Sequence, residues 1–350
     1  MSFATPTRLD WVQALRGLAA LLVLVSHLAQ IEARSVASPL LPPSAEWGKM
    51  GVDLFFVISG FIMVYVTRDW QGASGRRVPE FLFARASRIY PLYWIVSAAL
   101  LGVWLVRPDL VFSSSPNEPQ LLNSVLLVPA YAYPMLEVGW TLVYEMMFYI
   151  LFALLLILPA RLRVMGLLAW AAIVATGYIA GAQSGSALLF HLFSPLVLEF
   201  IAGALCGFVF LRVEGTRRLG LGLAVAGLAG LLLWFGIGGT FEDQGPRVWR
   251  LTLPGCALVL GAAWLDRHGM AAPRLAVQLG DWSYSLYLTH LLSLALIGKL
   301  WVLAGLSGAP TLVFLGTATL IAVGVAALTY RWIEVPLIAR ARGARQALFG

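Results

Sequence analysis

Long apolar stretches recur along this chain, and they restrict the folds open to it more than any other feature. Ten runs have about the 17 to 25 residues that a helix needs to cross a bilayer. They lie at residues 11–30, 51–67, 89–106, 138–158, 164–182, 187–211, 219–237, 249–265, 282–304 and 311–333. Strict alternation of apolar and polar residues, the mark of outer-membrane strands, is absent from these runs. Only 12% of the 350 residues are charged, about half the share of a soluble domain. We expect an all-α, multi-pass membrane protein with one transmembrane domain over residues 1–350.

Positively charged residues are distributed unevenly between the two sides that these spans define. With the amino terminus inside, sixteen Lys and Arg residues fall on the inner side and five on the outer side. The inner set is Arg8, Arg68, Arg76, Arg77, Arg85, Arg88, Arg161, Arg163, Arg212, Arg217, Arg218, Arg267, Arg274, Arg340, Arg342 and Arg345. The outer set is Arg34, Lys49, Arg107, Arg247 and Arg250. Because cytoplasmic loops are enriched in Lys and Arg, both termini are expected in the cytoplasm of a cell whose inner (plasma) membrane holds the protein. This bias also explains the net charge of +7 without a nucleic-acid partner.

Two ionisable residues interrupt the first apolar run, "ALRGLAALLVLVSHL". Arg16 and His27 are eleven residues apart, about three helical turns, so they share one face and lie roughly 16 Å apart along the axis. Each has a purely structural alternative, because Arg16 could extend to the inner headgroups and His27 could sit at the outer interface. Intramembrane charge costs about 2.5 to 3.5 kcal/mol per residue. Ionisable residues recur at compatible depths in other spans, and this recurrence favours a functional interpretation.

Two carboxylates fall at depths compatible with His27. Asp53 lies near the outer end of span 51–67, and Glu145 lies below the outer end of span 138–158. We expect the three side chains to converge in the outer half of the membrane. A carboxylate beside an imidazole fixes its tautomer and raises its basicity, as a general base requires. Asp53 alone is equally compatible with an ordinary residue at a helix start.

The inner side of the membrane is expected to carry a different kind of site. Arg85 and Arg88, in "FLFARASRIYPLYW", immediately precede span 89–106 and share a face if they are helical. Paired guanidinium groups suit phosphates, and they suit lipid headgroups equally well. In "GDWSYSLYLTHLL", Tyr284, Tyr287 and His290 have near-helical spacing. The tyrosines are interpreted as packing residues, whereas the role of His290 stays open.

Six stretches now match a known family in its own order. They are "LRGLAALLVLVSHL", "GVDLFFVISGF", "RASRIYPLYW", "WTLVYEMMFY", "GDWSYSLYLTH" and "YRWIEVP", and they span residues 10–336. With them the chain resembles the membrane-bound acyltransferase 3 family, which acylates extracytoplasmic carbohydrates. The last stretch departs from the common Glu-Arg-Pro at Val335, so no basic residue is expected to act there. Many members carry a carboxy-terminal hydrolase-like domain, and this chain resembles the stand-alone form that completes the transfer alone or with a separate partner.

The resemblance implies an O-acyltransferase, most simply an O-acetyltransferase, with acetyl-CoA or another acyl-CoA as donor and no bound cofactor or metal. The implied acceptor is a glycan or lipid-linked oligosaccharide, and membrane lipids and polysaccharide-assembly proteins are the other implied partners. Arg85 and Arg88 would hold the CoA phosphates, with Arg16 as a further contact. His27 would be the base that deprotonates the sugar hydroxyl, or an acyl relay, assisted by Asp53 and Glu145. Residues expected to line the substrate path are Trp140, Tyr284, His290 and Ser59.

Two other classes of membrane protein compete with this interpretation. A transporter or flippase of a lipid-linked sugar would use its midplane charges to bind substrate, but such proteins commonly show internal repeats that this sequence lacks. A carbohydrate polymerase or ligase usually has a large outer loop, whereas the largest loop expected here is residues 107–137. Consumption of a thioester with acylation of a glycan would distinguish the enzyme from a transporter, which would move the glycan unmodified.

Overall fold

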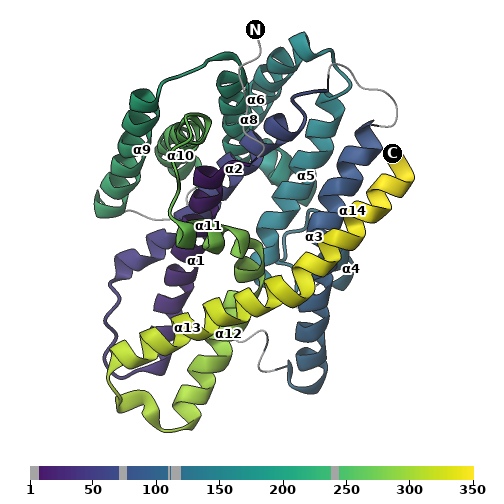
Figure 1. Ribbon diagram of the computed structural model, residues 1–350. Coiled ribbons are helices and arrows are strands. Elements are labelled where there is room, and N and C mark those ends of the chain that lie inside the picture. Colours follow the sequence, from purple (N-terminus) through teal and green to yellow (C-terminus); the bar gives the residue numbers. More distant parts are fainter. Residues whose placement is uncertain (1–7, 71–76, 109–110, 112–119, 238–243) are drawn as a thin grey trace. The chain divides into compact units, whose positions relative to one another are not determined.

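The computed structural model describes residues 8–70, 77–108, 111, 120–237 and 244–350, and every regular element in these ranges is helical (Figure 1). Ten helical segments within them are long and apolar enough to cross a membrane. Each of the ten overlaps one expected span, so the all-α, multi-pass architecture is confirmed. The side of the membrane on which the termini lie stays a prediction.

The described residues form fourteen α-helices. They are α1 (Asp10–Ser35), α2 (Met50–Val66), α3 (Arg77–Val106), α4 (Leu121–Leu126), α5 (Trp140–Leu155), α6 (Arg163–Ile179), α7 (Ala187–Leu192), α8 (Leu196–Arg212), α9 (Arg217–Ile237), α10 (Gln244–Arg267), α11 (Arg274–Asp281), α12 (Ser283–Leu303), α13 (Thr311–Thr329) and α14 (Val335–Phe349). A 3₁₀ turn, η1 (Pro43–Lys49), precedes α2, and a π-helical turn, η7 (Tyr330–Glu334), separates α13 from α14.

Two helix boundaries differ from the expectation and move functional candidates into helices. Helix α3 begins at Arg77, so Arg85 and Arg88 lie inside the helix and not before it. Helix α10 begins at Gln244, so Arg247, counted above with the outer loops, is a buried helical residue. Hydropathy ends a span at its first charged residues, whereas the backbone hydrogen bonds of a helix continue past them. Arg76, counted on the inner side, lies outside the described residues.

The expected span at residues 187–211 is also divided. Helix α7 ends at Leu192 and α8 begins at Leu196, with Phe193, Ser194 and Pro195 between them. Proline has no backbone N–H group and disfavours helical geometry in the residue before it, so the helix stops there. The break places the buried Glu199 in the first turn of α8.

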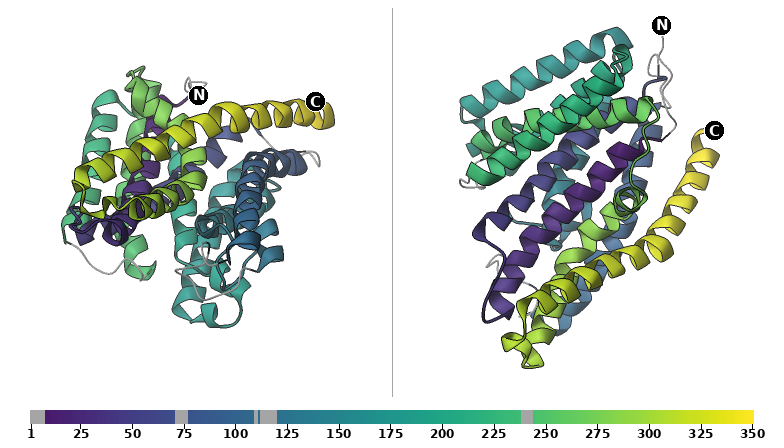
Figure 2. Two further views of the ribbon diagram at one scale, coloured as in Figure 1. Left: turned by 90° about the horizontal axis from the view of Figure 1, so that it is seen from below. Right: turned by 60° about the vertical axis from the view of Figure 1, so that its left-hand side comes forward.

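The chain divides into two compact units, and the first comprises residues 1–68 and 198–330. Within it α1 packs on α2, α10, α11, α12 and α13, while α9 lies beside α10 and α12 beside α13 (Figure 2). Glycines allow the closest approaches. A Cβ atom on Gly51 would lie 2.2 Å from the carbonyl oxygen of Ala19, and one on Gly280 would lie 1.9 Å from that of Gln13. Small residues at these points let α2 and α11 approach the backbone of α1, as in other membrane helix interfaces.

The second unit comprises residues 69–197 and 331–350, and within it α3 packs on α5 and α14. The aromatic residues of "RIYPLYW" hold the short helix α4. Tyr90, Tyr93 and Trp94 donate hydrogen bonds of 2.7, 2.8 and 2.9 Å to the last carbonyl groups of α4. These carbonyls have no partner within their own helix, so the aromatic side chains satisfy them. This motif is therefore a packing device of the second unit.

Candidate active site

Two imidazoles meet inside the first unit. Nε2 of His290, on α12, lies 3.2 Å from Nδ1 of His27, on α1. The ring centroids are 5.0 Å apart and the planes are inclined by 58°, so the rings meet through their nitrogens and are not stacked. His290 is buried and His27 is half-buried. The structure thus joins two residues from separate motifs, and the sequence had left the role of one of them open.

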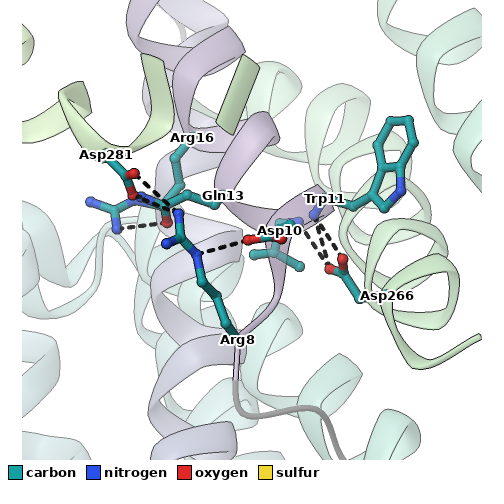
Figure 3. Close-up of polar contacts among 8 residues, drawn as sticks. Arg8, Asp10, Trp11, Gln13, Arg16, Asp266 and Asp281 are labelled. Atoms are coloured by element: carbon teal, nitrogen blue, oxygen red, sulfur yellow. Dashed lines mark hydrogen bonds and ion pairs between the residues drawn. The ribbon is translucent and has the colours of Figure 1, made fainter. Parts of the chain in front are cut away.

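The start of the "GDWSYSLYLTH" motif faces the same helix α1 at its amino-terminal end (Figure 3). The carboxylate of Asp281 accepts hydrogen bonds from Nη2 of Arg8 at 3.0 Å and from Nε2 of Gln13 at 3.0 Å. Nη1 of Arg16 donates to Oε1 of Gln13 at 3.4 Å, beside this group. Arg16 therefore lies in a polar cluster between α1 and α11, eleven residues before His27 on α1.

Asp53 has a partner that the sequence analysis did not predict. Its two carboxylate oxygens accept hydrogen bonds of 2.7 Å each from Nε and Nη2 of Arg247. Both side chains are buried, with exposed fractions of 2% and 7%. The carboxylate is thus engaged by a guanidinium, and Nδ1 of His27 faces His290; the expectation that Asp53 assists His27 stays a prediction. Glu199 is buried on α8, and Asp53 and Arg247 are the charged groups that act on it.

Glu145 belongs to the second unit, where it lies in a polar cluster between α3 and α5. The hydroxyl of Tyr149, one turn later on α5, donates a hydrogen bond to Oε1 of Glu145. Arg85 on α3 interacts electrostatically with Tyr149, Glu145 and Arg88. The guanidinium of Arg85 also lies over the ring of Phe81, 6.0 Å from its centroid. Glu145 thus has an arginine and a tyrosine as neighbours, and its expected convergence with His27 stays a prediction.

Arg88, the second arginine of the pair, is joined to the last of the six motifs. Its Nη1 lies 2.9 Å from Oε1 of Glu334, whose side chain is only 2% exposed. Glu334 ends the π-helical turn η7, directly after "YRWI". The glutamate of "YRWIEVP" thus positions an arginine of "RASRIYPLYW". An arginine held on one edge by a carboxylate keeps its other N–H donors for further acceptors.

Three residues expected to line the substrate path have less distinctive surroundings. Trp140 is half-buried at the start of α5, with its ring centroid 5.9 Å from that of Tyr144. Ser59 and Tyr284 are half-buried in the first unit. Their expected role as lining residues stays a prediction. Tyr287, interpreted as a packing residue, is buried and makes an edge contact with Phe55 at a centroid distance of 6.0 Å.

Two important polar residues were missed by sequence reasoning. Arg247 lies just before the apolar run at residues 249–265, so hydropathy predicts a loop there, whereas the helix extends back to Gln244. Glu334 was noticed only as part of a motif. It is a carboxylate directly after a long apolar run, and this was the signal that it needed a cationic partner.

Taken together, the fold and these polar groups define an integral membrane protein with an imidazole pair in one helical unit and an arginine-rich cluster in the other. A family profile described as "Acyltransferase domain" matches residues 9–331. The chain therefore belongs to the acyltransferase 3 family.

Similar proteins of known name agree with this assignment. The exopolysaccharide production protein ExoZ of Rhizobium meliloti is 34% identical over 318 residues, covering 85% of this chain and 92% of that protein. The acyltransferase MdmB of Streptomyces mycarofaciens is 27% identical, covering 81% of this chain and 78% of that protein. The O-acetyltransferase OatA of Staphylococcus aureus is 21% identical, covering 95% of this chain but 58% of that protein. No solved structure matches the chain significantly.

Proposed function

We propose that this acyltransferase moves an acyl group, most simply acetyl, from cytoplasmic acyl-CoA to a hydroxyl of an extracytoplasmic or lipid-linked polysaccharide, in the inner membrane. The observation that carries the proposal is the imidazole of His27. It is half-buried within a membrane-spanning helix and held by a second imidazole, although neither group is needed to stabilise an apolar helix. The similarity to ExoZ, a protein named for exopolysaccharide production, supports a polysaccharide as acceptor.

The proposed chemistry needs one group that accepts a proton. A nitrogen of His27 takes the proton of the acceptor hydroxyl as its oxygen bonds to the thioester carbon. The carbon–sulfur bond then breaks, the electron pair stays on the CoA sulfur, and the proton passes from the imidazole to that thiolate. The products are an O-acyl glycan and free CoA. If His27 is instead an acyl relay, the same nitrogen attacks the thioester first and passes the acyl group to the hydroxyl.

The donor is proposed to bind through its phosphates at the arginines of α3. Arg85 and Arg88 share one helix face, and planar guanidinium groups bind phosphate oxygens through two parallel hydrogen bonds. The ion pair with Glu334 would fix Arg88 in place for this task. Arg16 is proposed as a further donor contact. Both proposals require the cytoplasmic placement that the loop charges predict.

Acyl transfer by the purified protein tests this function directly. The chain would be reconstituted in lipid vesicles with radiolabelled acetyl-CoA and oligosaccharides of Rhizobium meliloti exopolysaccharide from which mild alkali has removed the esters. We expect alkali-labile label in the oligosaccharide together with release of free CoA. Movement of unlabelled oligosaccharide across the vesicle membrane without use of the thioester would instead indicate a transporter.

Replacing both Arg85 and Arg88 with Gln is expected to raise the KM for acetyl-CoA by about tenfold or more, with a much smaller change for the oligosaccharide. The reason is that each lost charged hydrogen bond contributes about 1.5 to 3 kcal/mol. Lys at both positions should restore only part of the affinity, because an ammonium group acts as a point charge.

The matched control for this double variant is Arg217→Gln with Arg218→Gln, an exposed pair at the start of α9 that the topology places on the same side. It should leave both KM values unchanged. Equal damage to both substrates in the α3 variant, or no damage, would show that Arg85 and Arg88 serve the structure or the lipid headgroups.

A further inference from the structure

The two nitrogens of each imidazole in the pair formed by His27 and His290 have different surroundings. Nδ1 of His290 lies 2.9 Å from the carbonyl oxygen of Leu286, one turn earlier on α12. A carbonyl oxygen only accepts hydrogen bonds, so this nitrogen carries the proton. In the neutral ring Nε2 then holds the lone pair, and Nε2 is the atom that faces His27.

The same reasoning assigns the tautomer of His27. Its Nδ1 lies 3.0 Å from the carbonyl oxygen of Val23 and 3.2 Å from Nε2 of His290, and both of these atoms are acceptors. Nδ1 of His27 therefore carries a proton shared between them, and its lone pair is on Nε2.

We propose that His290 is a positioning residue for His27, in a role that a carboxylate usually fills beside a catalytic imidazole. It holds His27 in the tautomer protonated on Nδ1 and so directs the lone pair of Nε2 to the reaction. When Nε2 takes the hydroxyl proton, the Nδ1–H of the cationic ring donates more strongly to the neutral Nε2 of His290. This inference rests on the proposed function, because it takes His27 as the reacting group. It holds whether His27 acts as a base or as an acyl relay.

Two substitutions of His290 separate its two contacts. The amide of Gln extends to about the position of Nε2, so His290→Gln keeps an acceptor for Nδ1 of His27. The shorter amide of Asn reaches only to about the position of Nδ1, so His290→Asn keeps the contact with Leu286 and loses the one with His27. Both variants keep a polar side chain at a buried position, so a difference in activity between them does not reflect burial alone.

The experiment measures kcat and KM for both variants in the vesicle assay with acetyl-CoA and de-esterified oligosaccharides. We expect His290→Asn to lower kcat by about 10- to 100-fold, comparable to the effect of removing a group that orients a metal-bound histidine, with both KM values within about twofold of wild type. His290→Gln should recover most of the loss. Thr289→Val, a near-isosteric change on the same turn of α12 that leaves the histidine pair intact, should keep wild-type kcat. Equal kcat in the Asn and Gln variants, or a higher kcat with Asn, would overturn the proposal.

A spectroscopic measurement tests the tautomer without depending on activity. The chain has four histidines, so ¹⁵N-histidine labelling in lipid nanodiscs gives few signals, and the loss of one signal in His27→Gln assigns that of His27. We expect His27 in the wild-type protein to be protonated on Nδ1, and His290→Asn to shift its Nδ1 signal. Protonation of His27 on Nε2 would overturn the inference even if acyl transfer is confirmed. A different result would count against the proposed function instead. If His27 has the expected tautomer but the His27→Gln variant keeps full turnover, His27 is not the reacting group.

Discussion

A His27→Ala variant is expected to lose acyl transfer by about 10³-fold or more, while the protein still inserts into the membrane and accumulates. A positioned general base contributes about 10² to 10⁴ in rate, and an acyl relay cannot be replaced by a methyl group. The side chain is half-buried, so its removal leaves the packing of α1 on its neighbours largely intact. Label transfer to de-esterified oligosaccharide, measured per folded protein in vesicles, gives the result.

The matched control is His268→Ala, which removes an exposed imidazole after the end of α10. It should transfer acyl groups at the wild-type rate. Thermal unfolding followed by tryptophan fluorescence would establish that both variants are folded. Normal turnover in a folded His27→Ala protein would show that the reacting group lies elsewhere.

An Asp53→Ala variant is expected to be destabilised by about 3 to 5 kcal/mol, the usual cost of breaking a buried ion pair by removing one partner. Arg247 would be left buried with its charge uncompensated and its two hydrogen bonds of 2.7 Å lost. The measurement is the free energy of unfolding in detergent micelles, together with the amount of protein that accumulates in the membrane. Activity should fall in parallel with the folded fraction.

Two further variants test whether the loss of stability comes from the buried charge. Replacing both members of the pair, Asp53→Leu with Arg247→Met, should recover much of the stability, because apolar side chains of similar size remove the need for a counter-charge. Glu46→Ala breaks an exposed ion pair with Lys49, whose Oε1–Nζ distance is 2.6 Å, and should cost no more than about 1 kcal/mol. If Asp53→Ala unfolds like the wild-type protein, the pair does not stabilise the fold.

The "GDWSYSLYLTH" motif shows how far sequence reasoning reached and where it stopped. Sequence spacing predicted that Tyr284, Tyr287 and His290 lie near one another on a helix, and in the structure the two helices that carry the motif, α11 and α12, both pack on α1. Gly280 allows the close approach of α11, Asp281 binds Arg8 and Gln13, and His290 reaches His27. The sequence indicated that these residues belong together. It could not indicate which helix they would face.

The partners of the buried charges were the least predictable part of the site. Asp53 was expected beside His27 from their similar depth, yet it binds Arg247. Depth follows from the position of a residue along a span, whereas a contact also depends on the rotation of each helix and on the choice of its neighbours. Apolar faces of many compositions pack equally well on one another or on lipid, so hydropathy alone does not determine that choice.

The amino-acid sequence by itself determined the membrane class and the approximate positions of the ten spans. Each backbone polar group in a bilayer must be satisfied within its own helix, so the length and hydropathy of local segments are sufficient for that prediction. Only the tertiary structure decided that His27 pairs with His290, Asp53 with Arg247 and Arg88 with Glu334. Each pair joins residues that are far apart in the sequence: Asp53 and Arg247 are 194 positions apart, and His27 and His290 are 263 positions apart. The pairs form only when the helices pack. A buried polar or charged group without a partner costs free energy, so packing arrangements that supply a complementary partner are favoured.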